Sequence, residues 1–95
     1  MPHMRANGSG FEGLCTLTFA ARREAAAICR LKSDPAQLRA GPKGVRGSVT
    51  LEPALAAELF RAGEGRLRLA DGSEFRFRVL AHTEGDGTVY FEMWR

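Results

Sequence analysis

The segment EGRLRLADGSEFRFRV, residues 64–79, decides the fold of this chain. Apolar and charged residues alternate on both sides of Ala70-Asp71-Gly72, which is typical of two antiparallel strands that each bury one face. A three-residue turn gives Gly72 the left-handed conformation that a type I turn with a bulge requires, whereas a two-residue Asp-Gly loop would set Leu67 against a charged side chain. The predicted register pairs Leu67 with Phe75, Arg68 with Glu74, and Glu64 with Arg78.

A further strand is predicted after the Thr83–Gly87 loop, where Val89, Phe91 and Met93 alternate with Tyr90, Glu92 and Trp94. Apolar side chains must meet on the buried face, and this fixes the register against the preceding strand. The second half of the chain is therefore a β-meander. Its predicted pairs are Val79 with Phe91, Phe77 with Met93, Arg78 with Glu92, and Arg76 with Trp94.

The first half of the chain also alternates. Phe11–Phe19 and Ala25–Lys32 each place apolar residues on one face, and Ala21-Arg22-Arg23 is the predicted turn between them. Because this turn lacks Gly, Asn and Pro, a helix over residues 20–32 remains an alternative, supported by the helix propensity of its Ala, Arg and Glu residues. A third strand is predicted from Val45 to Leu51.

Residues 33–44 carry two prolines and two glycines and are predicted to form a loop, with room for one helical turn after Asp34-Pro35. Pro53 then opens a short helix that ends at Gly63. Such a helix is marginal alone, so it must pack on the sheet or over the open end of a barrel. The apolar residues expected to make that contact are Leu55, Leu59 and Phe60.

We therefore predict a mainly β (α+β) fold: a small six-stranded antiparallel barrel or meander with one short helix between strands 3 and 4. Ninety-five residues suffice for a single core, so residues 11–95 form one small β-rich domain. Residues 1–10 are expected to be a disordered leader. The His3-Met4 pair is typical of a cloning site, which leaves open whether these residues are native.

The composition bears on where in the cell the protein is found and on what kind of partner it binds. No apolar run approaches the roughly 18 residues of a membrane helix, and no secretory signal opens the chain, so we expect a cytoplasmic protein that does not bind membranes. The net charge is +3, and 12 of the 14 basic residues are arginine. A joint excess of Arg, Ala and Gly is also typical of GC-rich bacterial genomes, so the basic charge is weak evidence for a nucleic-acid partner.

Cys15 and Cys29 both face inward on the predicted strands, and a hairpin centred on Arg22 sets them directly opposite each other. A disulfide between adjacent strands is strained and easily reduced. Free thiols that pack as small apolar groups suit a cytoplasmic chain better, although the sequence leaves the pairing open.

The outer face of the meander is the candidate site. Arginines that track phosphates and rings that stack on bases are typical of a platform for single-stranded nucleic acid. Against this, Glu74 and Glu92 can neutralise two of the arginines, and Arg76 can lie on Trp94 as a self-contained pair. The candidate binding residues, for nucleic acid or another partner, are Arg66, Arg68, Arg76, Arg78, Tyr90 and Trp94.

Catalytic chemistry finds little support in the sequence. His82 lies near Asp86, but no nucleophile, base and oxyanion donor come together, so we expect no enzyme. Metal-ligand spacing is missing, and neither Asn7-Gly8-Ser9 nor Asp71-Gly72-Ser73 continues as the cyclic-dinucleotide motif of PilZ-type barrels does. We accordingly expect no metal, no cofactor and no small-molecule ligand.

The first hypothesis for function is therefore a non-catalytic β-barrel interaction module. It would engage a protein, or a second copy of this chain, through an exposed strand edge, the region of Tyr90 and Trp94, or the loop of residues 33–44. The second hypothesis is single-stranded nucleic-acid binding through the arginine and aromatic face.

Overall fold

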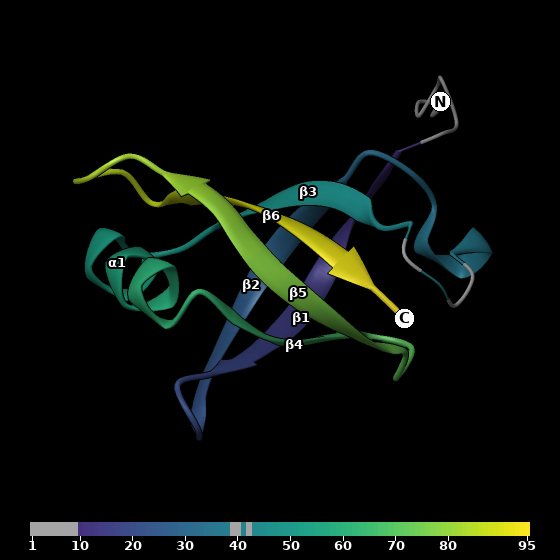
Figure 1. Cartoon of the computed structure of the whole chain (residues 1–95), viewed down its shortest axis with the longest axis horizontal. Coiled ribbons are helices and arrows are strands. Elements are labelled where there is room, and N and C mark those ends of the chain that lie inside the picture. Colours follow the sequence, from purple (N-terminus) through teal and green to yellow (C-terminus); the bar gives the residue numbers. More distant parts are fainter. Residues whose placement is uncertain (1–9, 39–40, 42) are drawn as a thin grey trace.

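The computed structural model describes residues 10–38, 41 and 43–95. The predicted leader therefore lies outside the described residues except for Gly10, which is exposed. The fold is a six-stranded antiparallel closed β-barrel with one short helix between strands 3 and 4, as predicted (Figure 1). Its elements are β1 (Phe11–Phe19), β2 (Arg23–Leu31), the 3₁₀ turn η2 (Pro35–Gln37), β3 (Val45–Thr50), α1 (Pro53–Ala62), β4 (Glu64–Leu69), β5 (Glu74–His82) and β6 (Thr88–Trp94).

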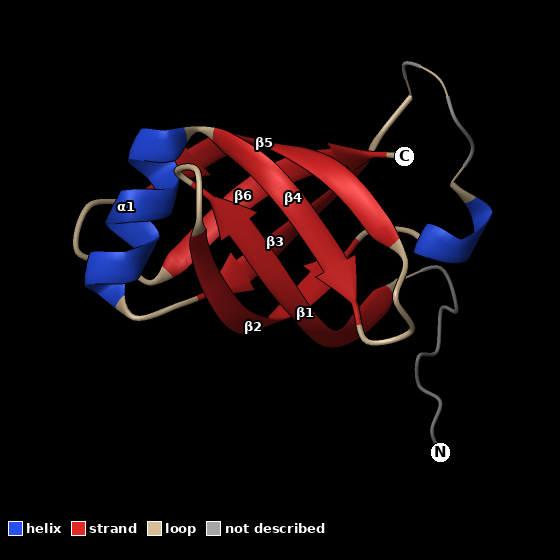
Figure 2. Cartoon of the chain, turned by 90° about the horizontal axis from the view of Figure 1, so that it is seen from below, coloured by secondary structure: helices blue, strands red, loops and turns tan. Residues whose placement is uncertain are grey.

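The strands follow one another around the barrel in the order β1-β2-β3-β6-β5-β4, and β4 pairs with β1 to close it. Figure 2 shows α1 over one end of the barrel and η2 beyond the other. Every described strand has a neighbour on both sides, so no strand is free along its whole length. Parts of the edges still extend past their neighbours: β1 pairs with β4 only over Cys15–Phe19, and β2 pairs with β3 only over Ile28–Leu31.

The meander follows its predicted registers. Leu67 pairs with Phe75 and Phe77 pairs with Met93, and Gly72 takes a φ of 93° in the turn between β4 and β5. One irregularity was not predicted: the β5–β6 register shifts between Val79 and Ala81, so Leu80 is an extra residue on β5. Such a bulge turns an additional side chain outward, and Leu80 is 43% exposed.

The first hairpin is formed by two strands, so the alternative helix over residues 20–32 is wrong. Its loop is Ala20–Arg22 rather than Ala21–Arg23, which moves the register by one pair. The two alanines of this loop adopt positive φ, 48° at Ala20 and 73° at Ala21, a conformation that their sequence does not signal.

This register corrects the predicted cysteine geometry. Cys15 pairs with Ala27 and Cys29 pairs with Gly13, so the two cysteines are diagonal neighbours on adjacent strands instead of direct partners. Both cysteines still face inward, because moving the centre of the hairpin by one residue changes each partner by two positions, and residues two apart share a face of the strand. Both cysteines are buried and free.

Helix α1 begins at Pro53 and ends where Gly63, with a φ of 82°, donates its backbone N–H to the carbonyl of Leu59. Its inward face differs from the prediction: Ala56 and Leu59 are buried, while Phe60 is 48% exposed. Ala56 and Leu59 stand three residues apart and share a face, whereas Phe60 is turned about 100° from Leu59. The Phe60 ring lies instead against His82, with ring centroids 5.5 Å apart.

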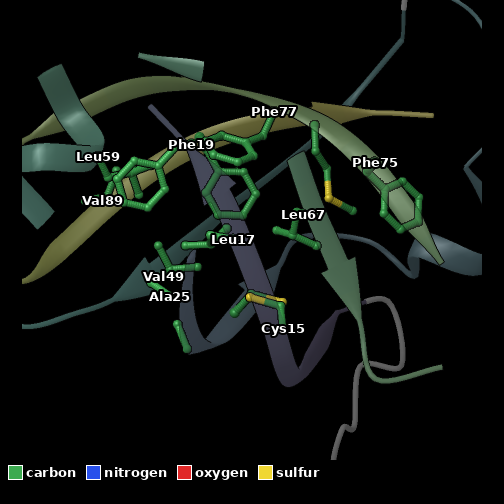
Figure 3. Close-up of a cluster of buried hydrophobic side chains, with 14 of the residues drawn as sticks. Cys15, Leu17, Phe19, Ala25, Val49, Leu59, Leu67, Phe75, Phe77 and Val89 are labelled. Atoms are coloured by element: carbon green, nitrogen blue, oxygen red, sulfur yellow. The ribbon is translucent and has the colours of Figure 1, made fainter. Parts of the chain in front are cut away.

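The interior is filled by side chains of unequal size. Strand β2 contributes only Ala25, Ala27, Cys29 and Leu31, while β5 and β6 contribute Phe75, Phe77 and Phe91. Figure 3 shows Phe19 and Phe77 near each other, with Leu59 reaching in from α1 beside Val89. Gly65 pairs with both Phe19 and Phe77, and a Cβ added there would lie 2.9 Å from the Phe77 ring. Small residues on one wall therefore make room for aromatic rings on the other.

The strained loop of the first hairpin makes a testable prediction. Ala21→Gly should raise the free energy of unfolding by about 1 kcal/mol, because glycine adopts positive φ without steric cost. Ala26→Gly, at an exposed position within β2, should lower it by roughly 0.5–1 kcal/mol. Urea titrations followed by circular dichroism measure both changes, and a loss of stability in Ala21→Gly would contradict the described loop.

The corrected face of α1 can also be tested. Leu59→Ala should lower the free energy of unfolding by about 2–5 kcal/mol, because it opens a cavity at the covered end of the barrel. Phe60→Ala removes a larger side chain but one that is half exposed, and should cost less than about 1.5 kcal/mol, chiefly the lost contact with His82. Chemical denaturation at neutral pH compares the two variants, and equal losses would restore the predicted packing of Phe60.

Candidate functional site

Four of the six predicted binding residues gather around one hollow on the outer face of β4, β5 and β6, with a volume of about 520 Å³. We call it the Trp94 hollow. They alternate along their strands with the buried residues of the barrel, which is why their side chains point outward. The hollow is lined by Gly41, Glu64, Gly65, Arg66, Arg76, Phe77, Arg78 and Trp94.

Two arginines of the Trp94 hollow face each other. Arg66 on β4 is the direct cross-strand partner of Arg76 on β5, and both side chains are exposed. Within the described part of the chain, neither has a carboxylate within 4.0 Å. Like charges directly opposite each other destabilise a sheet, so this pair costs the fold stability in the absence of an anion.

Arg78, rather than the predicted Arg76, lies over Trp94. The Arg78 guanidinium carbon is 5.5 Å from the centroid of the indole ring, within the range of a cation–π contact. Arg76 is the direct partner of Trp94, but a long side chain also reaches the diagonal neighbour across a strand pair. Arg78 Nη2 also lies 4.0 Å from Glu92 Oε1, so the predicted pairing of Arg78 with Glu92 is present.

The remaining two predicted residues lie outside the Trp94 hollow. Arg68 pairs with Glu74 on β5 and Thr16 on β1, but no ion pair joins Arg68 to Glu74 in the described residues, contrary to the expected neutralisation. Tyr90 lies at the other end of β6 and is 52% exposed. The six predicted residues therefore do not form one continuous binding surface.

Tyr90 belongs to a second hollow of about 430 Å³, which we call the Tyr90 hollow. Its three cations, Arg30, Lys32 and Arg46, come to Tyr90 only through the pairings of β2 with β3 and of β3 with β6, which the sequence does not set. The lining residues are Arg30, Leu31, Lys32, Arg46, Gly47, Ser48, Leu80, Tyr90 and Phe91.

A row of alternating charge runs from the Tyr90 hollow, lined by Arg46, to the Trp94 hollow, lined by Arg78 and Glu64. Arg46 on β3 pairs with Glu92 on β6, Glu92 with Arg78 on β5, and Arg78 with Glu64 on β4. Opposite charges at directly facing positions stabilise a sheet. Positive and negative charges thus alternate along this row, whereas beside it Arg66 and Arg76 bring two positive charges together.

The two cysteines contact each other inside the core. Their hydrogen bond raises the pKa of Cys15 far above its usual range and lowers the pKa of Cys29. Both side chains are buried, which keeps the two thiols from reagents in solvent. Among the described residues, no group of three or more His, Cys, Asp or Glu side chains could hold a metal ion.

His82 is held by two neighbours. Its Nε2 lies 2.8 Å from the backbone carbonyl of Asp86, and its ring lies against Phe60. Asp86 uses its carboxylate Oδ1 to accept a bond from the Thr88 N–H at 3.2 Å. His82 therefore contacts the backbone of Asp86, while the Asp86 carboxylate binds Thr88. These local contacts order the β5–β6 loop.

Comparison with known proteins adds no relative: no protein-family model, no curated protein and no solved structure matches the chain. Within the described residues, no helix is both long enough and apolar enough to span a membrane.

The contact between Arg78 and Trp94 can be checked by fluorescence, since Trp94 is the only tryptophan of the chain. Arg78→Ala should expose the indole ring to water and shift its emission to longer wavelength. Arg76→Ala, which removes the neighbouring side chain but not the group over the ring, should leave the emission unchanged. Equal shifts in the two variants would contradict the described geometry.

Proposed function

We propose that this protein is a non-catalytic binding module for single-stranded nucleic acid, which it holds at the Trp94 hollow. The observation that carries this proposal is the directly opposed pair of Arg66 and Arg76, both exposed and both without an ion pair in the described residues. The pair lines a hollow together with an indole ring.

The chemistry of the hollow supports a phosphate ligand in particular. A phosphate between two opposed guanidinium groups would replace their repulsion with charge-assisted hydrogen bonds, for which the planar arginine fork is well suited. Arg78 lies over the Trp94 ring, and both guanidinium planes and aromatic rings are surfaces on which unpaired bases stack. Glu64 lines the same hollow and lowers its positive charge, so we expect modest affinity with a marked salt dependence.

Two observations favour this proposal over a protein partner, which the sequence placed first. Neutralisation of the arginine face argued against nucleic acid, yet Arg68 and Arg76 form no ion pair in the described residues. Protein docking was expected in part through a free strand edge, and in the closed barrel no strand is free along its whole length. A protein partner is the outcome to pursue if nucleic acid does not bind.

The proposal predicts that reversing the opposed charges abolishes most of the binding. Arg66→Glu combined with Arg76→Glu should weaken the affinity for mixed-sequence single-stranded DNA or RNA at least roughly ten-fold, as expected when two phosphate contacts are lost. The slope of log affinity against log salt should fall by about 0.7 for each lost contact. Fluorescence anisotropy of labelled oligonucleotides at two salt concentrations measures both quantities.

The matched control is Arg22→Glu combined with Arg61→Glu, which makes the same change in net charge at exposed positions on the first hairpin loop and on α1. Circular dichroism should show that both double variants remain folded. If the control weakens binding as much as the test variant does, attraction is unspecific and the hollow is not the site. Absence of binding by the unmodified protein at low salt would end the proposal.

A further inference from the structure

The Tyr90 hollow is a second basic surface that the proposed function does not use. Three cations, Arg30, Lys32 and Arg46, contribute to its lining, and its described lining contains no carboxylate. The Trp94 hollow, by comparison, includes Glu64. The Tyr90 hollow is therefore the more uniformly positive of the two.

The cations of the Tyr90 hollow are only weakly engaged by carboxylates. Arg30 Nε lies 3.6 Å from Glu12 Oε2, but both side chains are more than 60% exposed, and exposed pairs of this kind contribute little. Arg46 faces Glu92, whose carboxylate lies 4.0 Å from Arg78. In the described part of the chain Arg46 and Lys32 have no ion pair.

An aromatic and aliphatic surface stands beside these cations. Tyr90 is 52% exposed, and its direct partner on β3 is Ser48, which is too small to cover the ring. On the other side, Tyr90 pairs with Ala81, next to the bulge that turns Leu80 outward at 43% exposure. The bulge thus places an aliphatic side chain next to an open ring, where a flat apolar group can lie.

We infer that the Tyr90 hollow is a second nucleotide subsite, in which Tyr90 and Leu80 hold a base and Arg30, Lys32 and Arg46 hold its phosphates. This inference rests on the proposed function, because it assigns the hollow to the same single strand that the Trp94 hollow binds. Tyr90 and Trp94 lie four residues apart on the outer face of β6, which is about 14 Å along a strand. A strand that spans both hollows passes over Glu92, so the two contacts are separate and act together only on a longer oligonucleotide.

The test compares two lengths of labelled, mixed-sequence single-stranded DNA: a dinucleotide, which is too short to fill both hollows, and a strand of about twelve nucleotides, within the range of sites on small barrels. Tyr90→Ala should weaken binding of the longer strand roughly ten-fold, as expected for one lost base stack, and leave the shorter strand unaffected. Tyr90→Phe keeps the ring and should bind both lengths like the unmodified protein. Leu14→Ala, an exposed change outside both hollows, is the matched control.

The possible outcomes separate this inference from the proposed function. If Arg66→Glu with Arg76→Glu weakens binding while Tyr90→Ala binds the longer strand normally, the second subsite is wrong and the proposed function stands. If Tyr90→Ala weakens both lengths equally, Tyr90 is not a separate subsite. If neither variant changes affinity, or if no strand binds, both proposals are overturned and a protein partner becomes the hypothesis to test.

Discussion

The structure depends on one packing constraint: six strands must fill a closed interior with their inward side chains and leave no polar group there. No polar or charged side chain is buried in the described residues. Alternation along a strand is strict, so each inward residue fixes the outward position of the next. Leu67, Phe75 and Phe77 must face inward to fill the core, and this places Arg66 and Arg76 on the surface, opposite each other.

Local patterns were sufficient to predict the order of elements and the registers of the second half. The turn chemistry of Asp71-Gly72 set the first hairpin of the meander, and the alternation of apolar residues set the register of the second. Pro53 and Gly63 marked the ends of the helix. The first hairpin was placed one residue away because its loop uses two alanines at positive φ, a conformation that alanine does not signal. The bulge at Leu80 was missed for a similar reason, since no glycine or proline marks it.

The candidate site was predicted in part. Arg66, Arg76, Arg78 and Trp94 belong to strands joined by short turns, and the sequence brought them together. Arg30, Lys32 and Arg46 join Tyr90 only through pairings of β3 with β2 and β6, across a loop and a helix, and no local signal sets those registers. The choice of Arg78 over Arg76 as the group on Trp94 depends on side-chain reach, which strand register leaves open.

The pairing of β1 with β4 has a consequence for how the protein folds. Leu17 and Leu67 are partners in the barrel, yet fifty positions separate them along the chain. Each hairpin of the meander forms from neighbouring residues, whereas this closing contact must first overcome the entropy of a long loop. Until it forms, β1 and β4 each expose a row of unpaired backbone groups, and two such chains can pair with each other in place of closing. The longer this closure takes, the longer the two edges stay open to pairing between chains.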